Sequence, residues 1–448
     1  MKVNRFFSFI KKGSTKGMGL VLGRSSLICL MAIALLIFGF AVSQDVSAKS
    51  HQANQHWVGT WSTSPGGEDD RLFVDQTLRQ IVHITVGGRW LRVRFSNSFG
   101  TSPLVIDGAS IGIQDEGAVV FPASLKPLTF GGAPSITIPP GARVLSDPVK
   151  LKVADEENLA ISMYFINETI ASTTHNGAFQ TSYISLGDNT AVPNMVTDSK
   201  TLHWYWLTGV EVLAHRRARA VITLGDSLTD GNGSTVDANA RYPDWLARRL
   251  LARYRGNNRI AVLNQGIGGN RILNDGNKLN DPNPDWDWIL GVNALARLDR
   301  DVLTQSGVTH VILLEGLNDI GFPYVPDWSP LPDDFQVPIV TADEIIAGYK
   351  MIVKRVHAMG LKILIGTLTP YKGASYWSEE GEIKRETVND WIRTSKMPDG
   401  IIDFDEALRD PDDPQKLNDA YKAVDNIHLN DDGYKVMADA VDLKLLKK

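Results

Sequence analysis

The 448-residue sequence predicts two folded parts, an all-β sandwich or jelly roll followed by an α/β part with a mostly parallel sheet. Between residues 57 and 206, short apolar strands alternate with Gly and Pro, which is typical of sandwiches and jelly rolls. From residue 218 onward, apolar strands alternate with amphipathic helices, which indicates helices on both faces of a parallel sheet. The predicted organisation is therefore an N-terminal segment (1–48), a β part (57–206) and an α/β part (218–448).

Composition excludes several classes of protein. Hydrophobic residues make up 43% of the chain and charged residues 22%, an ordinary globular balance that excludes a largely disordered or fibrous chain. A net charge of −5 argues against a nucleic-acid-binding protein, which usually carries a basic stripe. The chain has a single cysteine, Cys29, so we expect no internal disulfide and no zinc site built on cysteines.

The first 48 residues have the three-part layout of a secretory signal peptide. Six basic residues precede an uninterrupted apolar run over 27–42, and Val46-Ser47-Ala48 supplies a small-residue cleavage pattern. We therefore expect an exported protein, extracellular or periplasmic, with this segment removed. The alternative is an uncleaved anchor, the chain's only expected route to a membrane, although its apolar run is short for a ~20-residue span. Cleavage would remove six of 46 basic and one of 51 acidic residues, leaving a net charge of −10.

Within the β part, the alternation at 91–95 indicates a half-buried strand. It follows a strand at 78–86 across Gly87-Gly88, which predicts a hairpin, and the interval 207–217 is interpreted as a short junction. We interpret this part as a buttress for the α/β part, with carbohydrate binding as the alternative. Tryptophans in such a part are more often core residues than ligand platforms, so we interpret its tryptophans as core. They are Trp57, Trp61, Trp90, Trp204 and Trp206.

The α/β part contains five expected strands and five expected helices. The strands are expected at 220–224, 260–264, 309–314, 362–366 and 401–404. The helices are expected at 242–254, 293–305, 342–357, 382–394 and 433–446.

Three of these strands run into polar or glycine-rich segments, and sites in open parallel sheets form at the carboxyl ends of strands. The first leads into 225–231, which would present Ser227 in a tight turn, although a plain turn with a helix cap fits equally well. The second leads into a glycine-rich loop at 266–270, where backbone N–H groups can approach a ligand. The third leads to Asn318, whose amide could stabilise an oxyanion or only form an Asx-turn.

A fourth segment, Asp425-Asn426-Ile427-His428, precedes the last expected helix. An Asp three residues before a His can orient its imidazole, although a helix cap beside an incidental His is the alternative. Taken together, the four segments supply a nucleophile, a backbone donor, an amide donor, a base and an orienting carboxylate. That set is complete for acyl transfer through a serine ester.

These segments resemble the four blocks of the GDSL (SGNH) hydrolase family. Gly225-Asp226-Ser227-Leu228 matches the first block, Gly269 the second, Gly316-Leu317-Asn318-Asp319 the third and Asp425-Asn426-Ile427-His428 the last. The resemblance implies a flavodoxin-like three-layer α/β/α sandwich with ester hydrolase activity. The preceding β part resembles a subgroup of secreted bacterial members, some linked with xylan esters and others known as arylesterases or lipases.

The resemblance also implies roles for five residues. Ser227 would be the nucleophile, His428 the base and Asp425 the orienting acid. The backbone N–H groups of Ser227 and Gly269, with the amide of Asn318, would form the oxyanion hole. We expect no metal and no other cofactor, and the expected partner is a small-molecule or polysaccharide ester rather than a nucleic acid.

Aromatic residues follow the expected catalytic strands and bear on the substrate. Exposed aromatics beside carboxylates suit stacking on sugar rings, so we expect short acyl (acetyl) esters on carbohydrate. One alternative is aryl or lipid esters, in which case these rings pack the loops or line an acyl pocket. A second is acyl transfer to an acceptor other than water. A third is a non-catalytic carbohydrate-binding protein with a hydrolase-like fold. The aromatics concerned are Trp286, Trp288, Phe322, Tyr324, Trp328, Tyr371, Tyr376 and Trp377.

Overall fold

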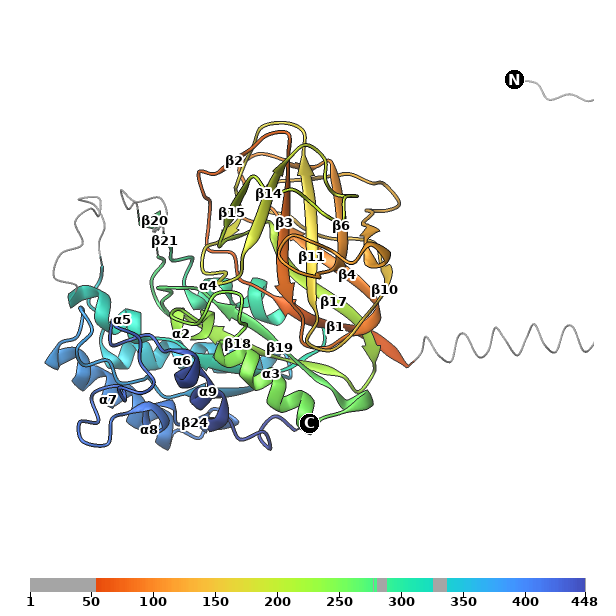
Figure 1. The fold of residues 1–448 in the computed structure, drawn as a ribbon. Helices are drawn as coiled ribbons and strands as arrows, with labels where there is room; N and C mark the ends of the chain where they lie inside the picture. Colours follow the sequence, from red (N-terminus) through yellow and green to blue (C-terminus); the bar gives the residue numbers. More distant parts are fainter. Residues whose placement is uncertain (1–53, 277, 280–287, 325–336, 448) are drawn as a thin grey trace, which may run out of the picture. The chain divides into compact units, whose positions relative to one another are not determined.

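The computed structural model describes residues 54–447, apart from 277, 280–287 and 325–336 (Figure 1). His56–Lys448 forms one compact unit that contains both the strand-rich half and the α/β half. The expected signal peptide (1–48), with Cys29, lies outside the described residues. Among the described helices, none has the length and apolar character that a membrane crossing requires.

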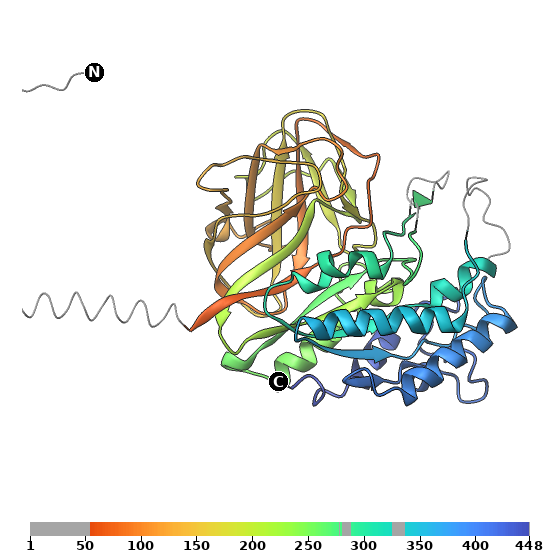
Figure 2. The same ribbon diagram turned by 180° about the vertical axis from the view of Figure 1, so that it is seen from behind.

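The strand-rich half is a sandwich of two antiparallel sheets (Figures 1 and 2), as predicted. One sheet has the order β1 (Gln55–Ser62), β17 (Leu207–His215), β4 (Gly88–Ser96) and β10 (Val149–Val153), with β9 (Arg143–Leu145) also on β4. The other has the order β15 (Ser199–Thr201), β14 (Ser182–Leu186), β3 (Gln76–His83), β11 (Asn158–Phe165), β6 (Gly108–Ile113) and β7 (Lys126–Pro127). Short ladders pair β2 (Leu72–Phe73) with β12 (Thr169–Ile170), β5 (Leu104–Ile106) with β8 (Ile136–Ile138), and β13 (Thr174–His175) with β16 (Trp204–Tyr205).

Aromatic rings fill the core of this sandwich. Trp206 packs against Phe165 and Phe73, with ring centroids 4.8 and 5.5 Å apart, and all three side chains are buried. Trp61 and Trp204 are also buried and meet edge to face at 4.9 Å. These tryptophans are core residues, as interpreted from the sequence. Among the five, Trp90 is exposed and Trp57 is half-buried beneath the Arg92 guanidinium.

The predicted hairpin across Gly87-Gly88 is wrong, because β3 and β4 lie in different sheets. A two-residue hairpin turn needs positive φ, and neither glycine has it. They serve close approach instead: a Cβ on Gly87 would collide with the Ala154 backbone, and one on Gly88 with the Val212 side chain. The interval 207–217 is also not a plain junction, since it contains β17, which pairs with β4.

The α/β half is built on a five-stranded parallel sheet with the order β19 (Ile260–Gly266), β18 (Arg219–Gly225), β22 (Val308–Leu314), β23 (Lys362–Gly366) and β24 (Gly400–Ile402). Numbered along the chain, this is the flavodoxin-like order 2-1-3-4-5, which confirms the predicted fold class. A small antiparallel pair, β20 (Lys278–Leu279) and β21 (Trp288–Ile289), lies outside the sheet.

Helices pack in two groups around this sheet (Figures 1 and 2). In one group α9 (Asp431–Ala440) contacts α3 (Tyr242–Arg253) and α8 (Phe404–Leu408). In the other, α6 (Ala342–Ala358) contacts α4 (Ala294–Leu298) and α7 (Glu379–Thr394). Two short helices that the sequence did not predict, α2 (Ser227–Asp230) and α5 (Leu317–Gly321), follow β18 and β22 directly.

Three expected elements end differently in the structure. The strand expected at 401–404 stops at Ile402, because Asp403 caps α8 by accepting a hydrogen bond from the Glu406 N–H. The last helix ends at Ala440 rather than 446, and Asp442 then accepts from the Lys444 N–H in a turn. The helix expected at 293–305 is α4 followed by a π-helical turn over Asp299–Leu303.

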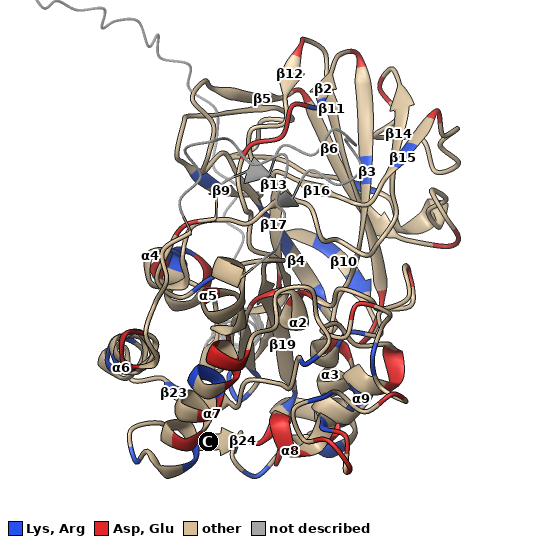
Figure 3. Cartoon of the chain, turned by 90° about the vertical axis from the view of Figure 1, so that its left-hand side faces the viewer, with Lys and Arg blue, Asp and Glu red and all other residues tan. Residues whose placement is uncertain are grey.

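The two halves share a hydrophobic core. Val58 and Val86 of the strand-rich half belong to the same buried cluster as Leu263 on β19. The Gly59 N–H donates to the Ser306 carbonyl at 2.9 Å. Polar contacts add to this: Arg94 on β4 donates to Gln305 Oε1 at 2.6 Å. Figure 3 marks the basic residues of the chain in blue, including those on the strands around β4.

Candidate active site

Ser227 stands at the point where β18 turns into α2. Asp226 caps this short helix by accepting a hydrogen bond from the Leu228 N–H at 3.0 Å, and Ser227 is the first helical residue. Gly225 has no room for a side chain, since a Cβ there would meet the Leu314 carbonyl and Thr229. The helix-cap interpretation and the presented-serine interpretation therefore describe the same turn.

Ser227, His428 and Asp425 form a continuous chain of hydrogen-bonding contacts. His428 Nε2 lies 2.8 Å from Ser227 Oγ, and His428 Nδ1 lies 2.6 Å from Asp425 Oδ2. Asp425 Oδ1 accepts from the N–H groups of Ile427 and His428 at 3.1 and 2.9 Å, which fixes the carboxylate. A hydrogen on Nδ1, facing the carboxylate, leaves Nε2 able to accept the serine proton.

Two carboxylates near Ser227 have opposite shifts in pKa. Burial acts to raise the pKa of Asp425, but its hydrogen bond to His428, the His428 charge and two backbone N–H groups hold it well below the usual range. Burial raises the pKa of Asp226 to about 7, although the Leu228 N–H and His428 act against the shift. Asp425 is therefore the carboxylate that stays ionised opposite the imidazole.

Gly269 lies on a turn that the Asn270 N–H closes onto the Ile267 carbonyl at 3.1 Å. Its φ is +73°, a conformation that favours glycine. Within the described part of the chain, the backbone N–H groups of Gly269 and Ser227 have no hydrogen-bond partner. Two unpartnered N–H groups are thus available at this edge of the sheet.

Asn318, in the first turn of α5, is restrained at both ends of its amide. Nδ2 donates to the Asn270 carbonyl at 3.0 Å, and Oδ1 accepts from the Tyr376 hydroxyl at 3.2 Å. The side chain is 4% exposed. One N–H of the amide remains without a partner among the described residues, so the group can still donate to a ligand.

The α/β half of the chain matches a known protein family. Residues 223–436 match the GDSL-like Lipase/Acylhydrolase family. The chain carries a GDSL-like lipase/acylhydrolase domain. It is a carboxylic ester hydrolase whose substrates are esters, which confirms the family that the motifs indicated. No curated protein matches the chain.

Several solved structures are similar to the GDSL domain at low identity. The native M. smegmatis aryl esterase is 16% identical, with a TM-score of 0.35, and the match covers 50% of this chain and 95% of that one. An acetyl xylan esterase is 22% identical, with a TM-score of 0.33 and coverages of 49% and 96%. A mutant of an acetyl-xylooligosaccharide esterase from Geobacillus stearmophilus is 20% identical, with a TM-score of 0.35 and coverages of 51% and 94%.

Arg297 on α4 organises the GDSL domain around Ser227, and the sequence analysis missed it. Its fully buried guanidinium donates to the carbonyls of Gly225 and Gln265 at 2.9 and 2.7 Å and to Asn270 Oδ1 at 2.8 Å. It thereby ties together the ends of β18 and β19 and the glycine loop. In the sequence it looks like any basic residue of an amphipathic helix, so no local signal marks it.

Asp319, in the third motif of the GDSL domain, also holds a loop in place. Its carboxylate accepts from the N–H groups of Ile272 and Leu273 at 2.8 and 3.1 Å. Burial raises the pKa of Asp319 to about 6, while these two N–H groups and Arg271 act in the opposite direction. The motif residue therefore fixes the segment that follows the glycine loop.

Three of the described aromatics that follow the motifs are buried and pack against one another. Tyr371 and Tyr376 are buried, with ring centroids 5.9 Å apart, and Phe322 meets Tyr376 edge to face at 5.9 Å. This outcome matches the alternative weighed from the sequence. Trp286, Trp328 and the side chain of Trp288 lie outside the described residues.

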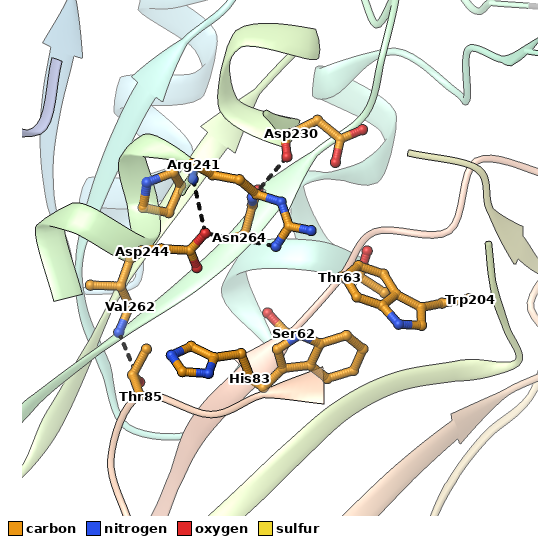
Figure 4. A pocket seen from close by; sticks show the side chains of 12 residues that line it. Ser62, Thr63, His83, Thr85, Trp204, Asp230, Arg241, Asp244, Val262 and Asn264 are labelled. Atoms are coloured by element: carbon orange, nitrogen blue, oxygen red, sulfur yellow. Dashed lines mark hydrogen bonds and ion pairs between the residues drawn. The ribbon is translucent and has the colours of Figure 1, made fainter. Parts of the chain in front are cut away.

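A small cavity of about 20 Å³ lies beside the GDSL site (Figure 4). His83, Thr85 and Trp204 line it from the strand-rich half, and Arg241 and Asn264 line it from the α/β half. Ser227, His428 and Asp425 do not line it, and a volume of this size suits about one water rather than an ester. Within the described residues, no group of three or more His, Cys, Asp or Glu could hold a metal ion.

Proposed function

We propose that this esterase hydrolyses short acyl esters through a covalent acyl-enzyme at Ser227. The observation that carries the proposal is the unbroken contact from Ser227 Oγ through His428 to Asp425. His428 takes the serine proton as Oγ bonds to the ester carbonyl carbon, and it returns the proton to the departing alcohol. Water then repeats the attack with His428 as base, which releases the carboxylic acid and restores the serine.

The developing oxyanion would be held by three donors. These are the backbone N–H groups of Ser227 and Gly269 and the free amide N–H of Asn318. Asn270 and Tyr376 fix the amide before substrate arrives, so little reorganisation is needed at the moment of reaction. Asp425 holds the imidazole tautomer and stabilises the imidazolium that forms.

The experiment that tests this assignment is Ser227→Ala, assayed on an aryl acetate and labelled with a fluorophosphonate. Loss of the nucleophile should lower kcat by at least about 10⁴-fold and abolish covalent labelling. The matched control is Thr229→Ser, a mild change in the same short helix that leaves Ser227 in place, and it should keep both activity and labelling. A Ser227→Ala protein with wild-type activity would contradict the assignment, and so would the absence of labelling in the wild type.

We infer short acyl groups on carbohydrate as the substrate class. Buried Tyr376 and Phe322 wall the side of the site next to Asn318, which supports a small acyl group there. In the sequence, Trp286 and Trp328 lie beside carboxylates in the segments after the second and third motifs, a composition suited to sugars. A panel of acetylated xylan, aryl acetates and longer acyl esters tests this class, with Ser227→Ala as the blank. A clear preference for aryl or long-chain esters would replace it.

We also propose that the protein is exported and that 1–48 is removed. The basic residues, the apolar run at 27–42 and the pattern Val46-Ser47-Ala48 support this. N-terminal sequencing of protein recovered outside the cytoplasm should begin at Lys49. An intact N-terminus on membrane-bound protein would favour the anchor alternative instead.

A further inference from the structure

Asp230, the last residue of α2, connects the strand-rich half to the glycine loop. Its Oδ1 lies 3.0 Å from Nε2 of His175 on β13, and its Oδ2 accepts from the Gly268 N–H at 3.1 Å. The two side chains are buried, with 4% and 3% of their surfaces exposed. The proposed mechanism uses neither residue, and the sequence analysis gave neither a role.

The hydrogen-bond partners fix the roles of two atoms of this pair. His175 Nδ1 lies 2.8 Å from the Ser64 carbonyl, which can only accept, so Nδ1 carries a hydrogen. Oδ2 of Asp230 must accept, because the Gly268 N–H can only donate. Burial alone would lower the pKa of His175, but the Asp230 charge and hydrogen bonds raise it overall. An imidazolium facing a carboxylate therefore satisfies every contact.

The sandwich holds His175 rigidly. Its ring stacks on Trp204 at 5.5 Å and 25°, and β13 pairs with β16 at these two residues. Trp204 is itself buried, and its Nε1 donates to the Ile81 carbonyl at 3.0 Å. The position of the imidazole is therefore set by the core of the strand-rich half.

At Gly268, the glycine loop depends on a side chain from another element. Gly268 and Gly269 have no side chains, and Asp230 is the partner that receives the Gly268 N–H. Gly266, two residues earlier, passes so close to the Asp230 backbone that a Cβ would collide with it. The loop is thus positioned against α2 by backbone packing on one side and by the Asp230 carboxylate on the other.

We propose that His175 is a positioning residue for the oxyanion hole: it fixes Asp230, and Asp230 fixes Gly268 and the adjacent Gly269 N–H. This role rests on the proposed function and adds to it. The strand-rich half then contributes to transition-state stabilisation, besides burying apolar surface. Trp204, on which His175 stacks, and Asp230 both line the small cavity shown in Figure 4.

Three variants test the role through kcat and KM on an aryl acetate, with rates expressed per phosphonate-labelled site. Asp230→Ala should lower kcat by about 10- to 100-fold, less than the loss of a whole oxyanion donor, and leave KM nearly unchanged. Asp230→Asn should stay within about threefold of the wild type, because its amide can accept from Gly268 and donate to neutral His175. The double variant Asp230→Asn/His175→Leu should again have a lowered kcat, as Asp230→Ala does, and it leaves no unpaired buried charge.

The matched control is Arg94→Met. It breaks another buried contact between the halves, to Gln305, but touches no loop of the active site. It should lower the melting temperature while kcat stays at the wild-type value. If Asp230→Ala and the double variant lower the melting temperature but keep wild-type kcat, the proposal is overturned, and an Asp230→Asn protein as slow as Asp230→Ala would also overturn it. A wild type inactive on every ester would instead contradict the proposed function itself, together with this role.

Discussion

At the scale of single residues, Asn318 illustrates how the site limits side-chain freedom before substrate arrives. One amide N–H donates to the Asn270 carbonyl and Oδ1 accepts from the Tyr376 hydroxyl, so among the described residues a single N–H remains free to serve the proposed oxyanion hole. The geometry makes the amide a fixed donor rather than a mobile one. Such preorganised donors contribute to the transition state more than to the ground state.

Two substitutions separate the donor from its support. Asn318→Ala should lower kcat by about 10²–10³-fold, the usual cost of one oxyanion donor. Tyr376→Phe keeps the buried ring and removes only the hydroxyl, so we expect a loss of about three- to tenfold in kcat, in line with about 1 kcal/mol for a neutral hydrogen bond. Steady-state kinetics on an aryl acetate measure both. Equal losses for the two variants would contradict the supporting role of Tyr376.

Residues with short-range signals could be predicted from the sequence, and residues with only long-range contacts could not. Ser227, Gly269, Asn318 and the pair in 425–428 each follow a strand or precede a helix in a recognisable motif, and the fold brings them to one edge of the sheet. Asp230 and Arg297, in contrast, reach partners 55 and 72 residues away in the chain, at His175 and Gly225. Their side-chain types occur on any helix surface, so only tertiary packing reveals what they hold.

At the scale of elements, Arg297 links α4 to two strands of the sheet. The guanidinium bonds to two strand ends at once and faces Asp301 and Glu315, each at 3.5 Å. A buried cation with this many acceptors cannot be replaced by an apolar group without leaving carbonyls and carboxylates unpaired.

Arg297→Met should therefore destabilise the fold by about 3–5 kcal/mol and lower kcat as well. Arg297→Lys should recover little of either, because an ammonium group cannot reproduce the planar fork that reaches three acceptors. Urea denaturation gives the free energy of unfolding, and aryl acetate kinetics give kcat. A stable, fully active Arg297→Met protein would show that the strand ends are held by other contacts.

The carboxyl end of β22 should make stability depend on pH. Burial raises the pKa of Glu315 from 4.5 to about 8, although Arg297 acts in the opposite direction. Its folded pKa is raised, so its contribution to stability is complete below about pH 4.5 and is lost as the pH rises through 8. The free energy of unfolding should fall across this window by up to about 1.4 kcal/mol per pH unit from this group.

Glu315→Gln removes this titratable group from both the folded and the unfolded state, so the free energy of unfolding should fall less steeply with rising pH. Asp226 and Asp319 also have raised pKa values and produce a decline of the same sign in both proteins. The difference between wild type and variant, measured by urea unfolding at about pH 5 and about pH 8, isolates the contribution of Glu315. Parallel profiles would mean that the buried carboxyl group ionises as easily in the folded protein as in the unfolded chain.

Element positions were predicted better than element partners. Hydrophobic alternation located β18, β22 and β23 to within a residue or two, because each buried strand is short and bounded by turn residues. The pairing of β3 with β4 failed, since glycines that permit close packing look the same in sequence as glycines that permit a hairpin. Helix caps such as Asp403 ended a strand earlier than expected, because the cap forms through a polar side chain that a hydrophobic pattern does not detect.

At the scale of the whole molecule, the two halves are joined by apolar packing. Val58, Val86 and Val212 are fully buried in a cluster that continues into the α/β half. Burying a valine contributes roughly 1.5–3 kcal/mol, which is large beside the small net stability of an ordinary domain, so exposing these three should be strongly destabilising. The Gly59 backbone also lies directly on Leu263, with no room for a side chain between them.

A truncated chain that begins at residue 216 should therefore fail to give soluble, active esterase. It would expose Leu263 and the apolar surface around it, and it would leave Asp230 without His175 beneath the glycine loop. Expression followed by circular dichroism and an aryl acetate assay measures the outcome. Soluble protein with wild-type kcat would count against both the buttress and the positioning role of His175. Soluble protein with native helicity but low kcat would retain the positioning role and show that the α/β half folds without the sandwich.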